Sequence, residues 1–263
     1  MRNNKRIGNI LFLITFARQT RLAYPDAKVD LMLTMPSQGT YIEGLGLDNI
    51  FYSHFSFKGI FKWLGLIKKL NTVKYDLILA PNCCASDSIT TAMIASKNKV
   101  SAYNERRVWA FPHAQHVTSS REHAAHSSLA ILESLGHQLC YPLNHNLPFS
   151  EDEIEQGANL SREYKTEEDS VDMVFFRGAR GVKLLSEEVW ETLLLKFESG
   201  TDKKINWIEV LSPDIKEPLR DNIKTFVTSN MRVLGTFLKT FDGFICCDTG
   251  PLHLADAADV KCI

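Results

Sequence analysis

The sequence predicts an α/β protein with two Rossmann-like domains, whose parallel sheets are expected to face each other across a cleft. Three observations carry this prediction. Short apolar strands alternate with helices along almost the whole chain, which is the pattern of parallel sheets in α/β proteins. A polar, acidic stretch at residues 150–170 interrupts the alternation once. The 263 residues also suffice for two domains that each bury a core.

The first predicted domain covers residues 1–149. Its opening helix ends where Tyr24-Pro25 stops the apolar pattern, and its longest strand reads YDLILA. The expected helices are 11–23, 58–70, 86–96 and 119–135, and the expected strands are 28–34, 75–80 and 100–103.

The acidic stretch 150–170 is predicted to be a linker, because it holds eight acidic and two basic residues and few large apolar ones. The second domain then covers residues 171–263. Its expected strands are 171–176, 205–211, 244–247 and 260–263, and its expected helices are 186–197, 214–223, 233–241 and 251–258.

Both ends of the chain look incomplete. An α/β unit normally opens with a buried strand, and residues 1–6 are too polar to form one. Residues 260–263 read as a strand with nothing after it. Two interpretations stay open: an unusual start and stop, or a chain truncated at both ends.

Composition and charge narrow the function classes. The net charge is -1, and the linker is so acidic that the rest of the chain is mildly basic. This suits an anionic small molecule, whereas nucleic acid calls for dense Lys/Arg stripes that the sequence lacks. The six cysteines match no zinc or disulfide spacing, which indicates reduced thiols in the cytoplasm.

The strongest local signal lies at residues 244–255. An apolar strand ends at Asp248, a turn follows through Thr249 and Gly250, and Pro251 stands where the first turn of a helix accepts proline. Free amides at such a helix start bind phosphate. The simpler alternative is a plain strand-turn-helix with Asp248 as the N-cap residue.

This segment resembles the C-terminal motif of the family 9 glycosyltransferases, the lipopolysaccharide heptosyltransferase group, in which Asp-(Ser/Thr)-Gly-Pro-x-His-Leu-Ala follows a strand. Other segments are similar to family signatures in order and spacing. They are Ile7-Gly8-Asn9-Ile10-Leu11, Ala23-Tyr24-Pro25-Asp26-Ala27, Tyr75-Asp76-Leu77-Ile78, and Lys183 followed by Trp190.

The resemblance implies a GT-B fold, with the acceptor bound mainly by the first domain and the nucleotide-sugar by the second. It further implies an inverting transfer of a heptose or similar sugar from an ADP-sugar to a lipopolysaccharide-core-type acceptor, lipid-linked or oligosaccharide. No metal and no cofactor beyond the ADP-sugar donor is expected.

The resemblance also implies a donor site. Negative charge grows on the leaving pyrophosphate, and the Lys183 ammonium with the amides of Thr249 and Gly250 would meet it. Asp248 would accept hydrogen bonds from sugar hydroxyls, and His253 would support the loop or touch the phosphate. Without the resemblance, Lys183 reads as an ordinary surface lysine.

Relatives place hydroxyl side chains where this chain has Gly178 and Ala179. The backbone amides of residues 177–181 are expected to replace them, with Arg177 or Arg180 adding charge.

The acceptor hydroxyl needs a general base. In the family this base is an aspartate after the glycine of the first loop, and this chain has Asn9 there. Asparagine cannot take a proton at neutral pH. Either another residue acts, with Asp87, Glu105 or His113 as candidates, or the chain is a poor catalyst.

Two further loops complete the candidate site. Asp214 or Glu217 would bind the nucleotide ribose, and Asn82 and Ser86 would face the acceptor. The alternative for Ser86 is an ordinary helix N-cap.

Two HxxH pairs, at His113 and His116 and at His123 and His126, invite a metal interpretation. No carboxylate or cysteine stands at a recognised ligand spacing, so we predict no metal site.

Residues 55–70 combine large apolar side chains with lysines, which is typical of peripheral membrane contact. The alternative is a helix whose apolar stripe packs in the core while its lysines face solvent. The expected location is the cytoplasm, peripheral at the inner membrane.

Two other function hypotheses stay open. One is a catalytically impaired or truncated relative that at most binds nucleotide. The other is a secreted protein, since residues 1–17 imitate a signal peptide.

Overall fold

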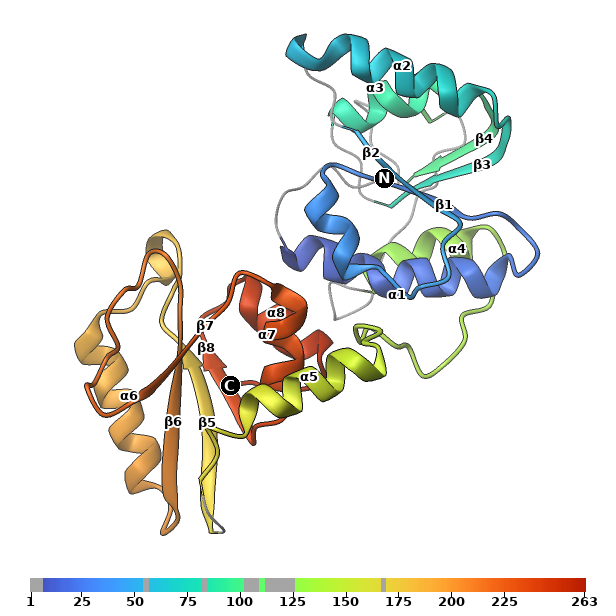
Figure 1. The fold of residues 1–263 in the computed structure, drawn as a ribbon. Coiled ribbons are helices and arrows are strands. Elements are labelled where there is room, and N and C mark those ends of the chain that lie inside the picture. Colours follow the sequence, from blue (N-terminus) through green and yellow to red (C-terminus); the bar gives the residue numbers. More distant parts are fainter. Residues whose placement is uncertain (1–6, 54–56, 82–84, 102–108, 112–125, 167–168) are drawn as a thin grey trace. The chain divides into compact units, whose positions relative to one another are not determined.

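A computed structural model describes residues 7–53, 57–81, 85–101, 109–111, 126–166 and 169–263 (Figure 1). The chain divides into two compact units, Met1–His145 and Asn146–Ile263. Both units combine helices with parallel strands, so the predicted α/β class is confirmed.

Unit 1 contains two pairs of parallel strands within its described residues. Strand β1 (Asp30–Leu33) pairs with β2 (Asn49–Tyr52), and β3 (Tyr75–Ala80) pairs with β4 (Ser96–Ser101). The helices are α1 (Ile7–Ala23), α2 (Ile60–Asn71), α3 (Ala85–Met93) and α4 (Ala130–Ser134).

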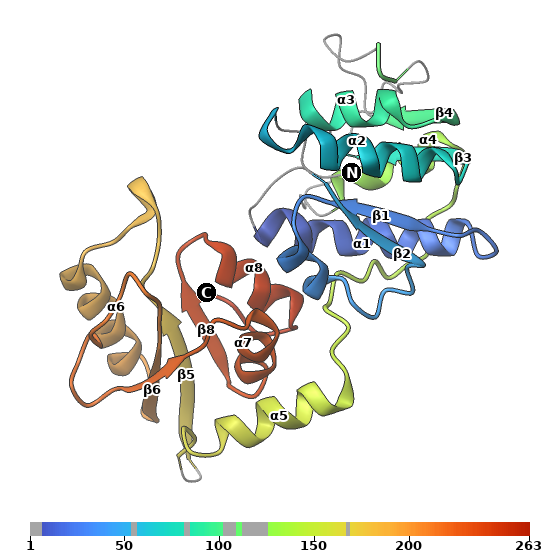
Figure 2. The ribbon, with the colours of Figure 1, turned by 45° about the horizontal axis from the view of Figure 1, so that its top comes forward.

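The core of unit 1 explains why α2 forms. Trp63, Ile67 and Leu70 recur at helical spacing and are buried together with residues of β1 and of the segment after α3. The Trp63 indole Nε1 donates to the Thr90 hydroxyl of α3 over 3.1 Å, so its polar atom is satisfied inside the core. Figures 1 and 2 show α2 and α3 side by side.

Unit 2 has one four-stranded sheet, with strand order β7-β6-β5-β8 and all neighbours parallel. The strands are β5 (Ser170–Phe176), β6 (Lys204–Leu211), β7 (Lys224–Val227) and β8 (Gly243–Cys246). The helices are α5 (Glu151–Ser161), α6 (Glu187–Ser199), α7 (Met231–Leu238) and α8 (Gly250–Ala257).

This strand order positions a ligand site. The chain starts at the inner strand β5, moves outward through β6 to β7, and then crosses over to β8 on the other side of β5. Helix α6 covers one face of the sheet, and α5 and α7 lie on the other (Figures 1 and 2). In such doubly wound sheets, ligands bind beyond the carboxyl ends of the strands, where the direction of winding reverses. In unit 2 this point lies between β5 and β8.

Residues 150–170, expected as a linker, contain the helix α5 instead. The Ser150 hydroxyl accepts from the Glu153 amide and the Glu153 carboxylate from the Ser150 amide, which forms a capping box. Gly157 then lets α5 approach α7, because a Cβ atom there would lie 2.6 Å from the backbone carbonyl of Thr236. The acidic composition therefore belongs to a packed helix with a polar outer face.

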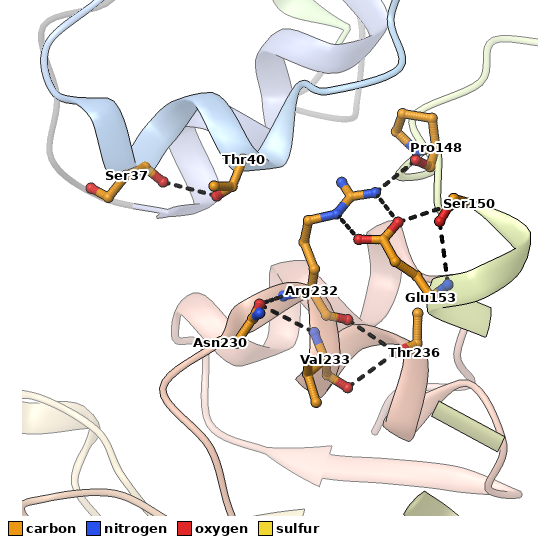
Figure 3. Close-up of polar contacts among 9 residues, drawn as sticks. All are labelled: Ser37, Thr40, Pro148, Ser150, Glu153, Asn230, Arg232, Val233 and Thr236. Atoms are coloured by element: carbon orange, nitrogen blue, oxygen red, sulfur yellow. Dashed lines mark hydrogen bonds and ion pairs between the residues drawn. The ribbon is translucent and has the colours of Figure 1, made fainter. Parts of the chain in front are cut away.

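An ion pair also holds α5 to α7, as Figure 3 shows. The Arg232 Nη2 atom donates to Glu153 Oε2 over 2.6 Å and to the Pro148 carbonyl over 2.8 Å, and Arg232 Nε donates to the same carboxylate. The Arg232 guanidinium also lies over the Phe149 ring. This pair was not predicted from the sequence.

The helix expected at residues 214–223 is wrong. Pro218 removes a backbone donor there, and the Leu219 amide donates to the buried Glu209 carboxylate over 2.7 Å. The segment is a series of turns that leads into β7, which was not predicted.

Other boundaries differ more modestly. Helix α1 already begins at Ile7, and strand β2 was not expected. Of the helix predicted at 119–135, residues 119–125 lie outside the described residues, and α4 lies within the described remainder. The predicted strand 260–263 is a single bridge in which Cys262 pairs in parallel with Phe244. No helix of the described residues is long and apolar enough to cross a membrane.

Candidate functional site

Two loops of unit 2 leave the sheet at the point where its winding reverses. The last residues of β5 and β8, Phe176 and Cys246, are direct neighbours in the parallel register. The loop of residues 177–186 and the turn of residues 247–249 therefore start side by side. These two segments carry Lys183 and Asp248, which are distant in sequence.

The turn after β8 has the predicted strand-turn-helix form. Helix α8 begins at Gly250 with Pro251 in its first turn, and its N-cap residue is Thr249, in an extended conformation. Asp248 is therefore not the N-cap. The Thr249 side chain does not cap the helix, and the first amides of α8 lie at the positive end of the helix dipole.

Lys183 and Asp248 are brought together at this edge. The Lys183 Nζ atom lies 3.2 Å from the Asp248 backbone carbonyl and also contacts the Asp248 carboxylate. Both side chains are about half exposed, at 50% for Lys183 and 60% for Asp248. The pair is thus open to a ligand.

His253 joins the pair from the next turn of α8. Its Nε2 atom lies 3.5 Å from Asp248 Oδ1. The hydrogen bond from Lys183 lowers the pKa of Asp248 below its usual range, and the positive charge of Lys183 acts in the same direction. Asp248 is therefore a carboxylate at neutral pH and an acceptor of hydrogen bonds.

The loop that carries Lys183 depends on two glycines. Gly181 has a left-handed backbone, with φ of +59°, at the start of the 3₁₀ turn Gly181–Lys183. A Cβ atom on Gly178 would lie 2.2 Å from the Phe176 ring. Gly178 and Ala179 are half-buried beside the end of β5, where small side chains leave the backbone accessible.

Arg177 does not belong to the anion site. Its Nε atom donates to Glu209 over 2.5 Å, Nη1 to Glu187 over 2.8 Å, and Nη2 to the Glu217 carbonyl over 2.8 Å. The guanidinium is buried, and its positive charge neutralises the buried Glu209 carboxylate. Arg180, in contrast, is exposed.

The candidates for the ribose lie in the loop after β6, at the same edge of the sheet. The side chains of Asp214 and Glu217 are both exposed. The Glu217 backbone is held in place by Arg177.

In unit 1 the candidates that the structure describes lie in two helices. Asn9 is in the first turn of α1, where the resemblance implied a loop. Ser86 and Asp87 are in the first turn of α3, and Asp87 is only 4% exposed. Ser86 is not the N-cap residue that its alternative reading expected, since it lies inside the helix. Asn82, Glu105 and His113 lie outside the described residues.

Glu209, the partner of Arg177, was not predicted from the sequence. Glu209 stands within the apolar strand KINWIEVL and is fully buried, at 0% exposure. A single carboxylate in such a strand needs a buried cation, and this requirement is the signal that could have identified the pair.

No family model and no curated protein sequence matches the chain. Solved structures do match it. A family 9 glycosyl transferase from Veillonella parvula superposes with a TM-score of 0.78 at 14% identity, covering 98% of this chain and 77% of that one.

The chain has the GT-B fold. Two heptosyltransferases of E. coli support this assignment at 99% coverage of this chain. WaaC with ADP-2-deoxy-2-fluoro heptose has a TM-score of 0.74 at 14% identity, over 85% of its length. ADP-heptose lipopolysaccharide heptosyltransferase II has a TM-score of 0.71 at 12% identity, over 82% of its length. The fold that the resemblance implied is thus confirmed for this GT-B chain.

Proposed function

We propose that the protein is an inverting, metal-independent glycosyltransferase that moves a heptose or similar sugar from an ADP-sugar to a lipopolysaccharide-core-type acceptor. The observation that carries the proposal is the meeting of Lys183, Asp248 and His253 beside the first amides of α8. Two of the similar structures are of WaaC with ADP or with ADP-2-deoxy-2-fluoro heptose, which supports a nucleotide-sugar as the donor.

The chemistry follows from the charges at this edge. The acceptor oxygen attacks the anomeric carbon from the side opposite the nucleotide, and the bond from that carbon to the phosphate oxygen breaks with inversion. The leaving diphosphate gains negative charge, which the Lys183 ammonium and the amides of Thr249 and Gly250 would stabilise. Asp248, an ionised acceptor, would hold hydroxyl groups of the sugar.

Lys183 would then exchange partners during the cycle. In the structure it contacts Asp248, and in the proposed donor complex it moves to the pyrophosphate. A lysine suits this exchange, because its ammonium is a rotatable point charge on a flexible stem. The amides near Gly178 and Ala179, with Arg180, would add donors, and Asp214 or Glu217 would bind the ribose.

The proton of the acceptor hydroxyl needs a base other than Asn9, since an amide has no basic site at neutral pH. Asp87 is the described carboxylate among our candidates, and it lies in the first turn of α3, after β3. Its burial means that it acts only if the acceptor or the start of α3 gives it access.

Asn9 also favours a second candidate function, a relative that binds nucleotide-sugar without transferring it. The two functions share the donor site and differ in the acceptor half-reaction. They are therefore separated by measuring turnover as well as binding.

Donor binding is tested first, by calorimetric titration of the protein with ADP and with ADP-heptose. Binding in the micromolar range that Asp248→Asn weakens at least about tenfold supports the site, because a charged hydrogen-bond acceptor is lost. Asp259→Asn is the matched control, since Asp259 is an exposed carboxylate just after α8. No binding by the folded wild type would refute the proposal.

Transfer is tested next, by the release of ADP from ADP-heptose with lipopolysaccharide-core acceptors, with and without EDTA. Metal-independent transfer predicts equal rates in both conditions. If donor binds but no acceptor yields product, Asn9→Asp distinguishes the candidates: a gain of turnover on restoring a carboxylate identifies an impaired relative.

A further inference from the structure

Helix α2 has two apolar sides, and the core uses only one of them. Trp63, Ile67 and Leu70 are buried in unit 1, as a core stripe should be. Phe61 is 86% exposed and Leu64 is 40% exposed. The two interpretations of this segment therefore apply to two different faces of the same helix.

The exposed face is also basic. Lys62, Lys68 and Lys69 are exposed on α2, and Lys58 is exposed in the 3₁₀ turn Phe57–Gly59 just before it. The sequence from this turn to the end of α2 contains no acidic residue. Lys58, Lys62 and Lys68 form no ion pair with any residue that the structure describes, while Lys69 lies over the Phe51 ring at 5.4 Å.

Helical geometry arranges these side chains as a shallow apolar strip with cations around it. At about 100° per residue, Phe61 lies at the centre of the exposed face, with Gly65 and Lys68 along the same line. Leu64 flanks this line on one side, and Lys62 and Lys69 flank it on the other. Gly65 adds no bulk, and nothing lies within 4 Å of a Cβ atom placed there.

We propose that this face of α2 docks the protein on an anionic phospholipid bilayer, with Phe61 and Leu64 inserted at the headgroup boundary and the lysines against the lipid charge. A helix that lies in the membrane interface needs such an apolar strip with basic flanks. The surplus of positive charge favours anionic lipid over an uncharged apolar partner. The inference goes beyond the proposed function, because it concerns unit 1 and requires no sugar chemistry.

The test is sedimentation of the whole protein with two kinds of vesicle, one of phosphatidylcholine alone and one in which phosphatidylglycerol makes up one third of the lipid. Wild type should bind the anionic vesicles, bind the neutral ones weakly, and lose most of its binding in 0.5 M NaCl. Lys62→Glu/Lys68→Glu should weaken binding at least about tenfold, and Phe61→Ser several-fold. Lys196→Glu/Lys203→Glu makes the same charge change on unit 2 and should leave binding unchanged.

Three results would overturn the proposal. The first is that folded wild type does not bind anionic vesicles, and the second is that the α2 variants bind them as well as wild type does. The third is a soluble dimer that Phe61→Ser dissociates in light scattering, because this face would then be a contact between two copies of the chain. Calorimetric titration of the α2 variants with ADP separates this test from the donor site, since the affinity for ADP should be the same as in wild type.

Discussion

Arg177 and Lys183 are cations on the same loop after β5, but their surroundings differ. Arg177 follows the strand directly, is buried, and donates to the carboxylates of Glu209 and Glu187 and to a carbonyl. Lys183 lies at the outer end of the loop, half exposed, and contacts Asp248. The first cation is fully engaged within the fold, and the second is within reach of solvent.

This difference separates stability from function. A buried carboxylate without its cation costs much free energy, whereas a half-exposed ion pair contributes little because water and salt screen it. The pair of Lys183 and Asp248 is therefore poorly explained as a stabilising contact. In unit 2, we therefore expect substitutions of buried ion-paired or closely packed residues to lower the free energy of unfolding more than substitutions of half-exposed ion-paired residues.

Arg177→Met should have the largest effect on stability. It leaves the Glu209 carboxylate buried without a cation, which should lower the free energy of unfolding by about 3–5 kcal/mol in urea denaturation. Arg177→Met/Glu209→Leu is the control, and it should recover part of the loss because no charge remains buried. A loss below about 1 kcal/mol for the single variant would contradict the distinction drawn between the two cations.

Gly157→Ala should have the second-largest effect on stability, although it changes no charge. The added Cβ atom would overlap the backbone of Thr236, so α5 must move away from α7, at a cost of about 2–3 kcal/mol. Gly65→Ala on the exposed face of α2 is the matched control and should stabilise by about 0.5–1 kcal/mol, since alanine favours a helix. Thermal unfolding of both variants checks the prediction, and a stable Gly157→Ala variant would show that α5 is not closely packed.

The third-largest effect on the free energy of unfolding should come from Glu153, and lowering the pH should reveal it. The hydrogen bond from Arg232 lowers the pKa of this carboxyl from 4.5 to about 2 in the folded protein. The unfolded chain therefore binds the proton first. The contribution is about 2 kcal/mol once screening of the partly exposed carboxylate by solvent is included, is complete above pH 4.5, and is lost as the pH falls toward 2. Glu153→Gln should flatten this part of the stability curve, measured by urea denaturation between pH 5 and 2.5, and an unchanged curve would disprove the linkage.

The fold was predictable from the sequence where an apolar run marks a strand. The apolar run YDLILA is β3, and the run before Asp248 is β8. Strands β2 and β7 were missed because each has four residues and exposed ends, so neither gives a hydrophobic signal. Helix α5 was missed because its buried residues, Gly157 and Ser161, are small and carry no apolar pattern.

The candidate site was predictable only in part. The turn at Thr249 and Gly250 follows from local sequence, because proline and glycine punctuate the chain there. The meeting of Lys183 with Asp248, 65 positions apart, rests on the order of the strands, which local pattern does not contain. Arg177 was misassigned for the same reason, since its partner Glu209 lies on the neighbouring strand.

Lys183→Met should have the smallest effect on stability and a large effect on binding. Removing a half-exposed cation should change the free energy of unfolding by less than about 1 kcal/mol. The same change should weaken ADP-sugar binding about tenfold to a hundredfold in calorimetry, because a charged hydrogen bond to phosphate is lost. Lys203→Met is the matched control: Lys203 pairs with Asp169 near the opposite ends of the strands, so it should show the same small change in stability and unaltered binding. Equal donor affinity in the two variants would place Lys183 outside the site and leave its pair with Asp248 as an ordinary surface contact.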